Sequence, residues 1–542
     1  MPLLKYTLDL EEPLLAAGRV SDPNSNTSLD FIPGSLLRGL LIHRYCAQAG
    51  QSDITHDALA RALFFDGTVR YLHAHPADPD GARTLPTPRT LLKAKYATPG
   101  NDGQWTLHNS AHAAFSAPSD QQLEREEKPF ITLGDDGTSA TLYAPRRTLS
   151  VHMQRDRRMG RATAENGAVF QYQALAEDQR FIGLIVVDDG AAAAHQVAKL
   201  KALTADPVAW LGGSRSAGYG RVELSLADTA TPEAPHGDED DKEDEDELTL
   251  TLLSDTLLVD PEGHPLAWAD LARLPAALGA ALSEAAGESV TLSESEIAWA
   301  RSSVGRALLG GYNSTWRLPL PPAPALAAGS VLVLRKRLPA PLRAAIQARG
   351  LGLRRVEGYG RCAFNLPLAA TLRAGSKDVA APTRAAQPIA GEAERLARRM
   401  AQRQLDQAIE AAITRFLRTG TSHNPPRRSQ LDWLAVQAQQ VLNTAEEQMD
   451  QAAQALRERL QELRQAAKQQ FERSQINGQS LAQWLDDHLA QPGQVWATLG
   501  LAGDQRLGVA GIAPDKAAVE LRTTLRLIAA AAGHWRKQEE GR

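Results

Sequence analysis

Two similar glycine-rich stretches occur in this chain: GGSRSAGYGRVEL at residues 212–224 and GLRRVEGYGRCAF at residues 352–364. Both contain the order Arg-x-x-Gly-Tyr-Gly-Arg, and each leads into a stretch that predicts a β-strand. A P-loop needs Lys-Ser/Thr before a helix, and the dinucleotide fingerprint also opens a helix, so neither fits. Glycines that let the main chain approach phosphates, beside neutralising arginines, favour a loop lying against a nucleic-acid backbone. The alternative is a turn needed only for packing, and the repetition weakens it.

The two stretches close two similar segments. Arg215 and Arg355 lie 140 residues apart (355 − 215), which is typical of duplicated domains rather than of solenoid repeats. Each segment opens on an alternating stretch, LKYTLDL at residues 4–10 and LTLTLLSDTLLV at residues 248–259, and ends on a strand after its glycine loop.

An acidic run, DEDDKEDEDE at residues 238–247, separates the segments. It carries nine acids and one lysine, a net charge of −8, which leaves +3 for the rest of a chain whose net charge is −5. Charges packed this densely repel one another and cannot be buried, which indicates a solvated linker. The predicted parts are a first domain at 1–231, the linker at 232–247, a second domain at 248–380 and a helical domain at 388–542.

The last part is rich in Ala, Gln, Glu, Arg and Leu and poor in Gly and Pro, which predicts helices. We expect one helix over residues 389–420 that ends at Gly420, and one long helix over residues 429–477 capped by Ser429. SLAQWLDDHL and PDKAAVELRTTLRLIAAAAGHW complete a predicted all-α bundle.

Composition predicts a cytoplasmic protein that does not span a membrane. The 542 residues are 43% hydrophobic, which is enough for several cores, and no long apolar run suggests a membrane span. The N-terminus lacks the layout of a signal peptide. Only two cysteines occur, Cys46 and Cys362, which argues against disulfide frameworks and thiolate zinc sites and for a reducing compartment.

A further motif, LDFIPGSLLRGLLIHRY at residues 29–45, predicts a turn followed by a helix. Ser35 can cap this helix, and its leucines face inward. Arg38 and Arg44 are expected on an exposed side, with Gly39 allowing close approach.

Together these motifs resemble the RAMP superfamily, the repeat-associated proteins of CRISPR effector complexes, and most closely the large multi-domain RAMP subunit of type III-D systems. The motif Ile-Pro-Gly-Ser-x-x-Arg-Gly near the N-terminus, followed by a Gly-rich loop in each of two domains, carries the resemblance. RRTLSVHMQRDRRMGRATAENGAVFQYQAL at residues 146–175 looks like the family's Arg-rich thumb hairpin and following strand. LGGYNSTWRLPLPPAPALAAGSVLVL at residues 309–334 looks like its second-domain segment.

The resemblance implies an α+β chain with two ferredoxin-like (RRM-like) domains, followed by an all-α helical bundle. It implies a guide-RNA-binding subunit that fuses a backbone domain with a thumb hairpin, a cap-like domain and a small-subunit-like helical domain. Its implied partners are the CRISPR guide RNA, target RNA, other RAMP subunits and the large signalling subunit of a type III complex.

The resemblance also implies a site that cuts target RNA, in which an aspartate before the Ile-Pro-Gly helix acts with a divalent metal, Mg²⁺. Asp30 occupies the family's position and would hold the metal, while Asp22 is a second candidate; either could instead be a cap or turn residue. His43 and His152 are rival candidates for a general base, as in guide-processing relatives. His73 and His75 have no third metal ligand nearby and are expected in a surface loop.

The predicted RNA-binding residues belong to the first helix, the hairpin, the two glycine loops and the 309–334 segment. They are Ser35, Arg38, Gly39, Arg44, Arg146, Arg147, His152, Arg155, Arg157, Arg158, Arg215, Gly218, Tyr219, Gly220, Arg221, Asn313, Trp316, Arg354, Arg355, Gly358, Tyr359, Gly360 and Arg361. Two other functions stay open: a stand-alone guide-processing endoribonuclease, and a structural scaffold without an active site.

Overall fold

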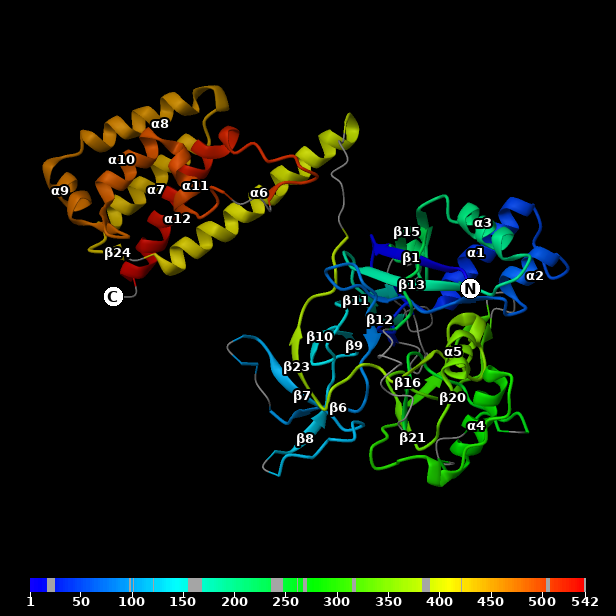
Figure 1. The fold of residues 1–542 in the computed structure, drawn as a ribbon. Coiled ribbons are helices and arrows are strands. Elements are labelled where there is room, and N and C mark those ends of the chain that lie inside the picture. Colours follow the sequence, from blue (N-terminus) through cyan, green and yellow to red (C-terminus); the bar gives the residue numbers. More distant parts are fainter. Residues whose placement is uncertain are drawn as a thin grey trace. The chain divides into compact units, whose positions relative to one another are not determined.

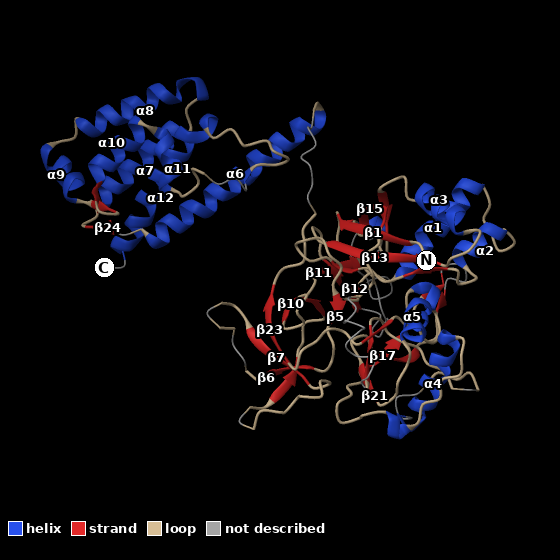
Figure 2. Cartoon of the chain, in the orientation of Figure 1, coloured by secondary structure: helices blue, strands red, loops and turns tan. Residues whose placement is uncertain are grey.

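The chain folds into two compact units, Met1–Thr383 and Arg384–Arg542, in a computed structural model (Figure 1). The prediction of a mixed α+β chain is confirmed (Figure 2). No described helix is long and apolar enough to cross a membrane. The structure describes residues 1–16, 25–96, 99–100, 102–119, 121–154, 168–234, 247–260, 262–266, 271–313, 318–382, 390–420, 422–503 and 507–540.

The first sheet has the strand order β14-β15-β1-β13-β3, with β4 also paired to β13. All its pairings are antiparallel. Apart from α2, β4, β14 and the strands that belong to other sheets, the chain order is β-α-β-β-α-β (β1, α1, β3, β13, α3, β15), the ferredoxin-like order. Every second residue of β1 is buried, from Leu4 to Leu10, which explains the alternating sequence. The elements are β1 (Leu3–Leu10), α1 (Gly34–Ala49), α2 (Ala58–Phe64), β3 (Val69–Tyr71), β4 (His75–Pro76), β13 (Arg180–Val187), α3 (Ala193–Leu203), β14 (Val208–Trp210) and β15 (Arg221–Asp228).

The second sheet repeats this order in a reduced form, β21-β16-β22. The place of the missing strand beside β21 is taken by isolated bridges, Ile297 with Leu334 and Ser303 with Val331. The second domain has its own apolar core, which includes Leu250 of β16, Leu278 of α4 and Leu332 of β21. The elements are β16 (Leu248–Leu252), α4 (Leu274–Ala286), β21 (Val331–Leu334), α5 (Ala340–Arg349) and β22 (Cys362–Phe364), with short ribbons β17 (Arg306–Leu309), β18 (Tyr312–Asn313), β19 (Leu318–Pro319) and β20 (Ala323–Leu326).

A third, seven-stranded sheet joins two distant parts of the chain. Residues 85–143 leave the first domain to supply six of its strands, and the seventh, β23 (Thr371–Ser376), follows the second sheet. β23 pairs in parallel with β10 and antiparallel with β7. Sequence patterns did not indicate this sheet, because most of its strands are only two to five residues long. Its other strands are β5 (Leu85–Pro86), β6 (Leu91–Ala94), β7 (Trp105–Asn109), β8 (Leu123–Arg125), β9 (Phe130–Leu133) and β10 (Ser139–Tyr143).

Both ends of the predicted linker are held by ion pairs. Glu233 pairs with Arg361 at 2.8 Å, and Glu247 pairs with Arg301. Solvated linker character therefore does not extend to Glu233 or Glu247, and residues 235–246 of the predicted linker lie outside the described part of the chain. The predicted boundaries at 231 and 248 stay predictions.

The second unit is helical, but the single long helix predicted over residues 429–477 is wrong. Three helices occupy this stretch, with breaks after Leu442 and after Gln461. Shorter helices can fold back so that Leu434, Leu456 and Phe471 meet in one core. Sequence did not show the breaks because they contain neither Gly nor Pro. The elements are α6 (Glu392–Thr419), β24 (Ser422–His423), α7 (Arg428–Leu442), α8 (Glu446–Gln461), α9 (Gln465–Arg473), β25 (Gln475–Ile476), β26 (Gln479–Ser480), α10 (Leu481–Ala490), α11 (Val495–Thr498) and α12 (Glu520–Glu540).

Candidate nucleic-acid interface

The first glycine loop is exposed from Arg215 to Gly218, whereas Gly220 is buried and Tyr219 is only 4% exposed, so the tyrosine does not offer a free ring to RNA. After a short 3₁₀ turn (Arg215–Ala217), Gly218 and Gly220 adopt φ values of 81° and 90°. A Cβ on Gly220 would lie 2.1 Å from the Leu211 carbonyl oxygen, whereas nothing lies within 4 Å of a Cβ on Gly218. Gly220 is therefore required for packing, while Gly218 leaves room for another molecule's backbone.

Two arginines flank this open glycine. Arg215 lies over the Trp210 ring, with the guanidinium carbon 4.1 Å from the ring centroid. Arg221 pairs with Glu11 at 2.7 Å, and 46% of its side chain remains exposed. Exposed guanidinium groups beside a free main-chain turn are the groups that contact phosphates.

The loop is attached to a β-hairpin formed by β11 (Arg147–Gln154) and β12 (Ala168–Leu175), the predicted thumb strands. β12 also pairs with β2 (Ser25–Thr27). The Tyr219 hydroxyl lies 2.9 Å from His152 Nε2, and the Ser214 hydroxyl donates to the Tyr172 hydroxyl at 3.1 Å. The rings of His152, Phe170, Tyr172 and Tyr219 form one cluster, which fixes the loop against one face of the hairpin.

The other face of the hairpin is apolar and exposed. Leu149, Val151 and Met153 alternate along β11 and are 63%, 67% and 56% exposed. Alternation places all three on the face opposite His152. The hairpin therefore carries an exposed apolar stripe on the face opposite the cationic loop.

Asp30 lies in the segment before α1 and faces the start of the hairpin. Its Oδ1 accepts a hydrogen bond from Arg147 Nη2 at 2.7 Å, and 43% of its side chain is exposed. The structure thus brings together Asp30 and Arg147, two predicted residues 117 positions apart in the sequence. Asp22 lies outside the described residues. Among the described residues no group of three or more His, Cys, Asp or Glu could hold a metal ion.

The second glycine loop differs from the first at its central glycine: Gly358 is buried, whereas Gly218 is exposed. A Cβ on Gly358 would lie 2.6 Å from the carbonyl oxygen of Tyr71 in the first sheet. Gly34, at the start of α1, approaches the same oxygen, and its Cβ would lie 1.8 Å from it and 2.9 Å from the Glu357 oxygen. The interpretation of this loop as an open RNA contact is therefore corrected: its glycines are needed where the second domain packs on the first.

The remaining residues of the second loop also make contacts within the protein. Tyr359 is 5% exposed and meets the His73 ring edge-to-face at 4.7 Å. Arg355 pairs with Glu284 at 2.5 Å. Arg354 lies over Tyr359 and pairs with Glu357, while Arg361 donates to Glu233 and to the Ala348 carbonyl. A Cβ on Gly360 would lie 1.9 Å from the Leu351 carbonyl oxygen, so this position needs glycine for packing, as Gly220 does.

The first helix differs from expectation in its polar residues. Pro33, not Ser35, occupies the N-cap, and no side chain caps the helix. Arg38 Nε donates to the Phe64 carbonyl at 2.8 Å. Arg44 donates to three carbonyls between α3 and β14, those of Leu203, Asp206 and Val208. Neither arginine is freely exposed, because Arg38 bonds the C-terminal residue of α2 and Arg44 bonds the C-terminal residue of α3. Gly39 is exposed, with nothing within 4 Å of its Cβ position.

Other predicted residues have separate positions. Arg146 is exposed and donates to the carbonyls of Glu177 and Asp178, and His43 is exposed on α1. The expectation that His73 and His75 lie in a surface loop is wrong, because each is 2% exposed. Arg155, Arg157, Arg158, Trp316 and the side chain of Asn313 lie outside the described residues.

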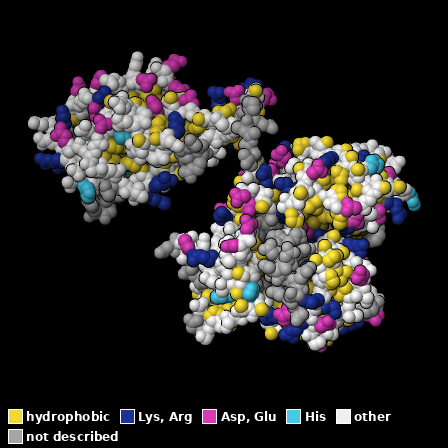
Figure 3. Space-filling model, in the orientation of Figure 1, with side chains coloured by type: hydrophobic (Ala, Val, Ile, Leu, Met, Phe, Trp, Pro, Cys, Tyr) yellow, Lys and Arg dark blue, Asp and Glu magenta, His cyan; other side chains and the backbone are white. Residues whose placement is uncertain are grey.

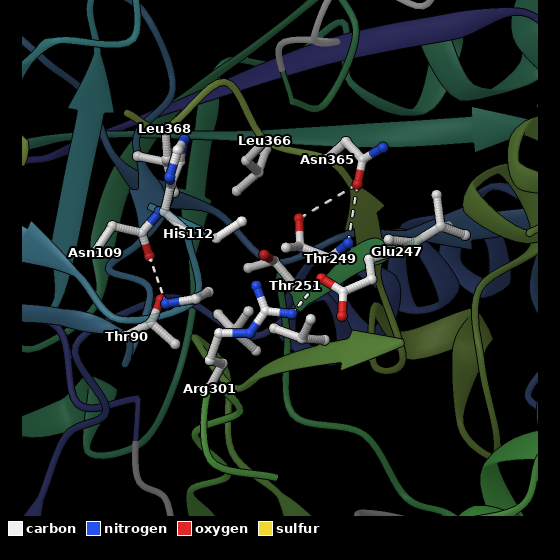
Figure 4. A pocket seen from close by; sticks show the side chains of 15 residues that line it. Thr90, Asn109, His112, Glu247, Thr249, Thr251, Arg301, Asn365, Leu366 and Leu368 are labelled. Carbon is white, nitrogen blue, oxygen red and sulfur yellow. Dashed lines mark hydrogen bonds and ion pairs between the residues drawn. The ribbon is translucent and has the colours of Figure 1, made fainter. Parts of the chain in front are cut away.

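A cavity of about 370 Å³ opens beside Asp30 and Arg147. A smaller one of about 130 Å³ lies between the seven-stranded sheet and the second sheet (Figure 4). In the smaller cavity Asn365 accepts a hydrogen bond from the Thr249 amide and Glu247 pairs with Arg301, while the buried Thr90 hydroxyl has no partner among the described residues. On the face drawn in Figure 3, Lys and Arg side chains lie beside Asp and Glu side chains, so no single basic field covers it.

Comparison with known proteins gives structural neighbours only. No protein-family profile and no curated protein matches the chain. Type III-B Cmr-beta bound to cognate target RNA and AMPPnP has a chain with a TM-score of 0.35 and 13% identity, covering 61% of this chain and 86% of that one. A RAMP protein binding different RNA substrates has a TM-score of 0.29 and 8% identity, covering 67% and 100%. Oligomeric Cmr4 from Pyrococcus furiosus has a TM-score of 0.20 and 14% identity, covering 43% and 100%.

Proposed function

We propose that this chain is a guide-RNA-binding subunit of a type III CRISPR effector complex, of the type III-D class, and that its first domain forms part of the backbone that holds the guide. The observation that carries the proposal is the open first loop, where Gly218 leaves space for an approaching backbone between Arg215 and Arg221. The motif resemblance supplies the identity of the nucleic acid. Other RAMP subunits and the large signalling subunit would be its protein partners.

The interface suits binding that does not depend on sequence. Arg215 and Arg221 can neutralise phosphates, and the open space at Gly218 lets a phosphate backbone come close to both side chains. The apolar stripe of Leu149, Val151 and Met153 offers a surface on which unstacked bases can lie. We therefore expect affinity to fall with salt and to vary little with guide sequence.

The other parts of the chain would extend this role. The reduced second sheet would act as the cap-like domain, joined to the first through the buried second loop. The helical unit Arg384–Arg542 would act as the small-subunit-like part on the target side.

We further propose that Asp30 serves target-RNA cleavage, with Asp22 as the second candidate. In this reaction a 2′-hydroxyl attacks the neighbouring phosphorus in line, and the bond to the leaving 5′-oxygen breaks. Arg147 would orient the Asp30 carboxylate through their hydrogen bond. A Mg²⁺ ion held by Asp30 would supply charge neutralisation when bound, and it would need phosphates of bound RNA as further ligands, since Mg²⁺ sites of this kind combine one or two carboxylates with phosphates.

Two measurements test the proposal. In gel-shift assays over a salt series, the double variant Arg215→Glu and Arg221→Glu is expected to weaken guide-RNA binding at least tenfold for two unrelated guide sequences. Unchanged binding would exclude the first loop from the interface.

Cleavage is tested in the assembled complex with Asp30→Ala and Asp22→Ala, each with and without Mg²⁺. Loss of one cut with either variant supports the endonuclease; retention of every cut with both would leave a scaffold without an active site. Metal-independent cutting of repeat RNA by the isolated chain, lost in His152→Ala, would instead favour the guide-processing enzyme.

A further inference from the structure

The one exposed tryptophan among the described residues, Trp210, lies beside the first glycine loop. It is the last residue of β14, the edge strand of the first sheet, and it is 37% exposed. The other tryptophans within the described ranges are buried or half-buried. Because Tyr219 of the loop is only 4% exposed, Trp210 is the aromatic side chain that this region presents to solvent.

The register of the first sheet places Trp210 on its solvent face. Trp210 is paired with Arg221 of β15, and Ala209 is paired with Val222. Ala209 and Val222 are buried in the core that also contains residues of α1 and α3. Since successive side chains of a strand point to opposite faces, Trp210 and Arg221 lie together on the face away from these helices.

Arg215 lies over the indole ring and keeps its hydrogen-bond donors. Its guanidinium carbon is 4.1 Å from the ring centroid, and Arg215 makes no ion pair with a described acid. A cation–π contact places the positive charge without using the N–H groups of the guanidinium, which therefore remain available to a phosphate. The indole stays partly open despite this contact, because 37% of Trp210 is exposed.

The charge on this face of the sheet is mixed. Arg221 pairs with Glu11 at 2.7 Å, and its backbone amide donates to Glu12 Oε2 at 3.3 Å. Glu223, the next outward residue of β15, is exposed. These acids offset part of the attraction of Arg215 and Arg221 for phosphates, so an aromatic contact would add affinity that the charges alone do not supply.

An exposed ring beside a guanidinium group suits an unpaired base. Proteins hold the bases of single-stranded RNA on aromatic side chains and arginine planes, with basic groups on the neighbouring phosphates. A base inside a double helix is stacked on both faces and cannot reach such a ring.

We propose that Trp210 stacks on one unpaired base of the bound strand while the adjacent phosphate contacts Arg215. This inference rests on the proposed RNA-binding function and adds a base contact to the phosphate contacts of the first loop. Since every base has a π-face, the contact tolerates any sequence. If Trp210 instead only held Arg215 in place, its loss would weaken phosphate contacts and would have no base-dependent effect.

The test compares two single-stranded ten-mers in anisotropy titrations of the full chain, one of uridine and one of the same ribose-phosphate backbone without bases. Trp210→Ala is expected to weaken binding of the uridine ten-mer at least fivefold and binding of the abasic ten-mer less than twofold. Trp210→Phe, which keeps an aromatic ring, should bind the uridine ten-mer within threefold of the parent. Unchanged binding of the uridine ten-mer by Trp210→Ala, or an equal loss for both ten-mers, would overturn the proposal.

Phe65→Ala is the matched control. Phe65 is 42% exposed, the Arg38 guanidinium carbon lies 5.5 Å from its ring centroid, and it precedes β3, the opposite edge strand. Its loss is expected to change both affinities less than twofold, and a fivefold loss here as well would overturn the assignment to Trp210. Thermal unfolding shows whether each variant folds. If Trp210→Ala does not fold, Trp210→Leu takes its place with the same expected losses.

Intrinsic fluorescence gives an independent measurement. Stacking of a base on an indole ring quenches its emission, so saturation with the uridine ten-mer is expected to quench the parent more than Trp210→Phe, although both bind. Equal quenching of the two proteins would contradict a base on Trp210.

The base contact and the proposed function can fail separately. If the double variant Arg215→Glu and Arg221→Glu binds RNA as the parent does, the first loop is not the interface and both proposals are wrong. If that variant loses binding while Trp210→Ala keeps its affinity for the uridine ten-mer, phosphate binding at the loop stands and only the base contact is wrong.

Discussion

The two Gly-Tyr-Gly loops share their residue order but not their surroundings. In the first, Gly218 faces open space and Arg221 is half exposed; in the second, Gly358 touches the Tyr71 carbonyl and the Arg361 side chain is only 7% exposed. The last glycine of each, Gly220 or Gly360, has the same packing role. The same motif therefore has the same packing role in both domains, but only the first copy leaves its central glycine exposed to solvent.

The largest expected effect concerns the middle of each loop. Gly358→Ala places a Cβ against the backbone of Tyr71 and His73, and no side-chain rearrangement relieves this contact. We expect a loss of several kcal/mol in the free energy of unfolding. The matched Gly218→Ala meets no atom and should cost only about 1 kcal/mol, for its left-handed φ. Denaturant unfolding of both variants measures the difference, and equal losses would contradict it.

A second comparison concerns the last arginine of each loop. Arg361→Ala leaves Glu233 buried without its closest partner, so we expect a loss of about 3–5 kcal/mol. Arg221→Ala removes a half-exposed pair with Glu11 and should cost at most about 1 kcal/mol. Thermal melts of the two variants test this, and Glu233→Gln, which retains a hydrogen-bond acceptor, should fall between them.

The last glycine of each loop donates a backbone hydrogen bond to a different residue. Gly220 donates to the Pro13 carbonyl, and Gly360 donates to the Asp255 carbonyl. Burial raises the pKa of Asp255 to about 6. Its ionised form therefore destabilises the fold above pH 6, and this cost disappears as the pH falls towards the unfolded-state value.

Asp255→Asn should accordingly stabilise the protein at pH 8, by no more than about 3 kcal/mol, and not at pH 4. The measurement is the difference in unfolding free energy between variant and parent across this range. The variant must be compared with the parent at each pH, because other groups also change the stability of both proteins. His73 and His75, whose pKa values are lowered by burial, destabilise the fold as the pH falls, whereas Asp255 destabilises it as the pH rises. A gain that does not vary with pH would contradict the assignment.

The smallest effect concerns the first arginine of each loop. Arg215→Glu should weaken RNA binding about tenfold and reduce the salt slope. Arg355→Glu, whose parent side chain pairs with Glu284, should change affinity less than twofold. Filter binding at two salt concentrations gives both values, and an equal loss in both variants would restore the interpretation of two RNA-contacting loops.

Sequence alone predicted what local pattern controls. The alternation of β1 and the helical composition of the last unit were visible as patterns, whereas the hairpin strands were expected only from the resemblance. Whether there is room for a Cβ at a glycine depends on residues far away in the sequence. Gly358, for example, packs against Tyr71, and no local sequence pattern indicates this contact. The ion pair between Arg361 and Glu233 could not be predicted for the same reason. Glu233 lies close to the acidic run and was therefore assigned to the linker.

The candidate site was predicted in part. Asp30 and Arg147 were chosen separately, from a resemblance, and the structure joins them. The cavity residues Arg89, Phe130 and Asp255 carried no motif, because they come from an inserted sheet of short strands and from the second domain. One usable signal was Asp255, an isolated aspartate three residues after the end of the buried strand β16.

The strand β23 has a consequence for how the protein forms during synthesis. Ser139 of β10 pairs with Arg373, 234 positions later (373 − 139), so the seven-stranded sheet stays unfinished until that part of the chain has left the ribosome. Contacts of such long sequence separation form late and slow folding. The first sheet, whose strands are complete by Asp228, can form while β10 still has an unpaired edge. A nascent chain halted before Thr371 would therefore carry an exposed strand edge open to pairing with other chains.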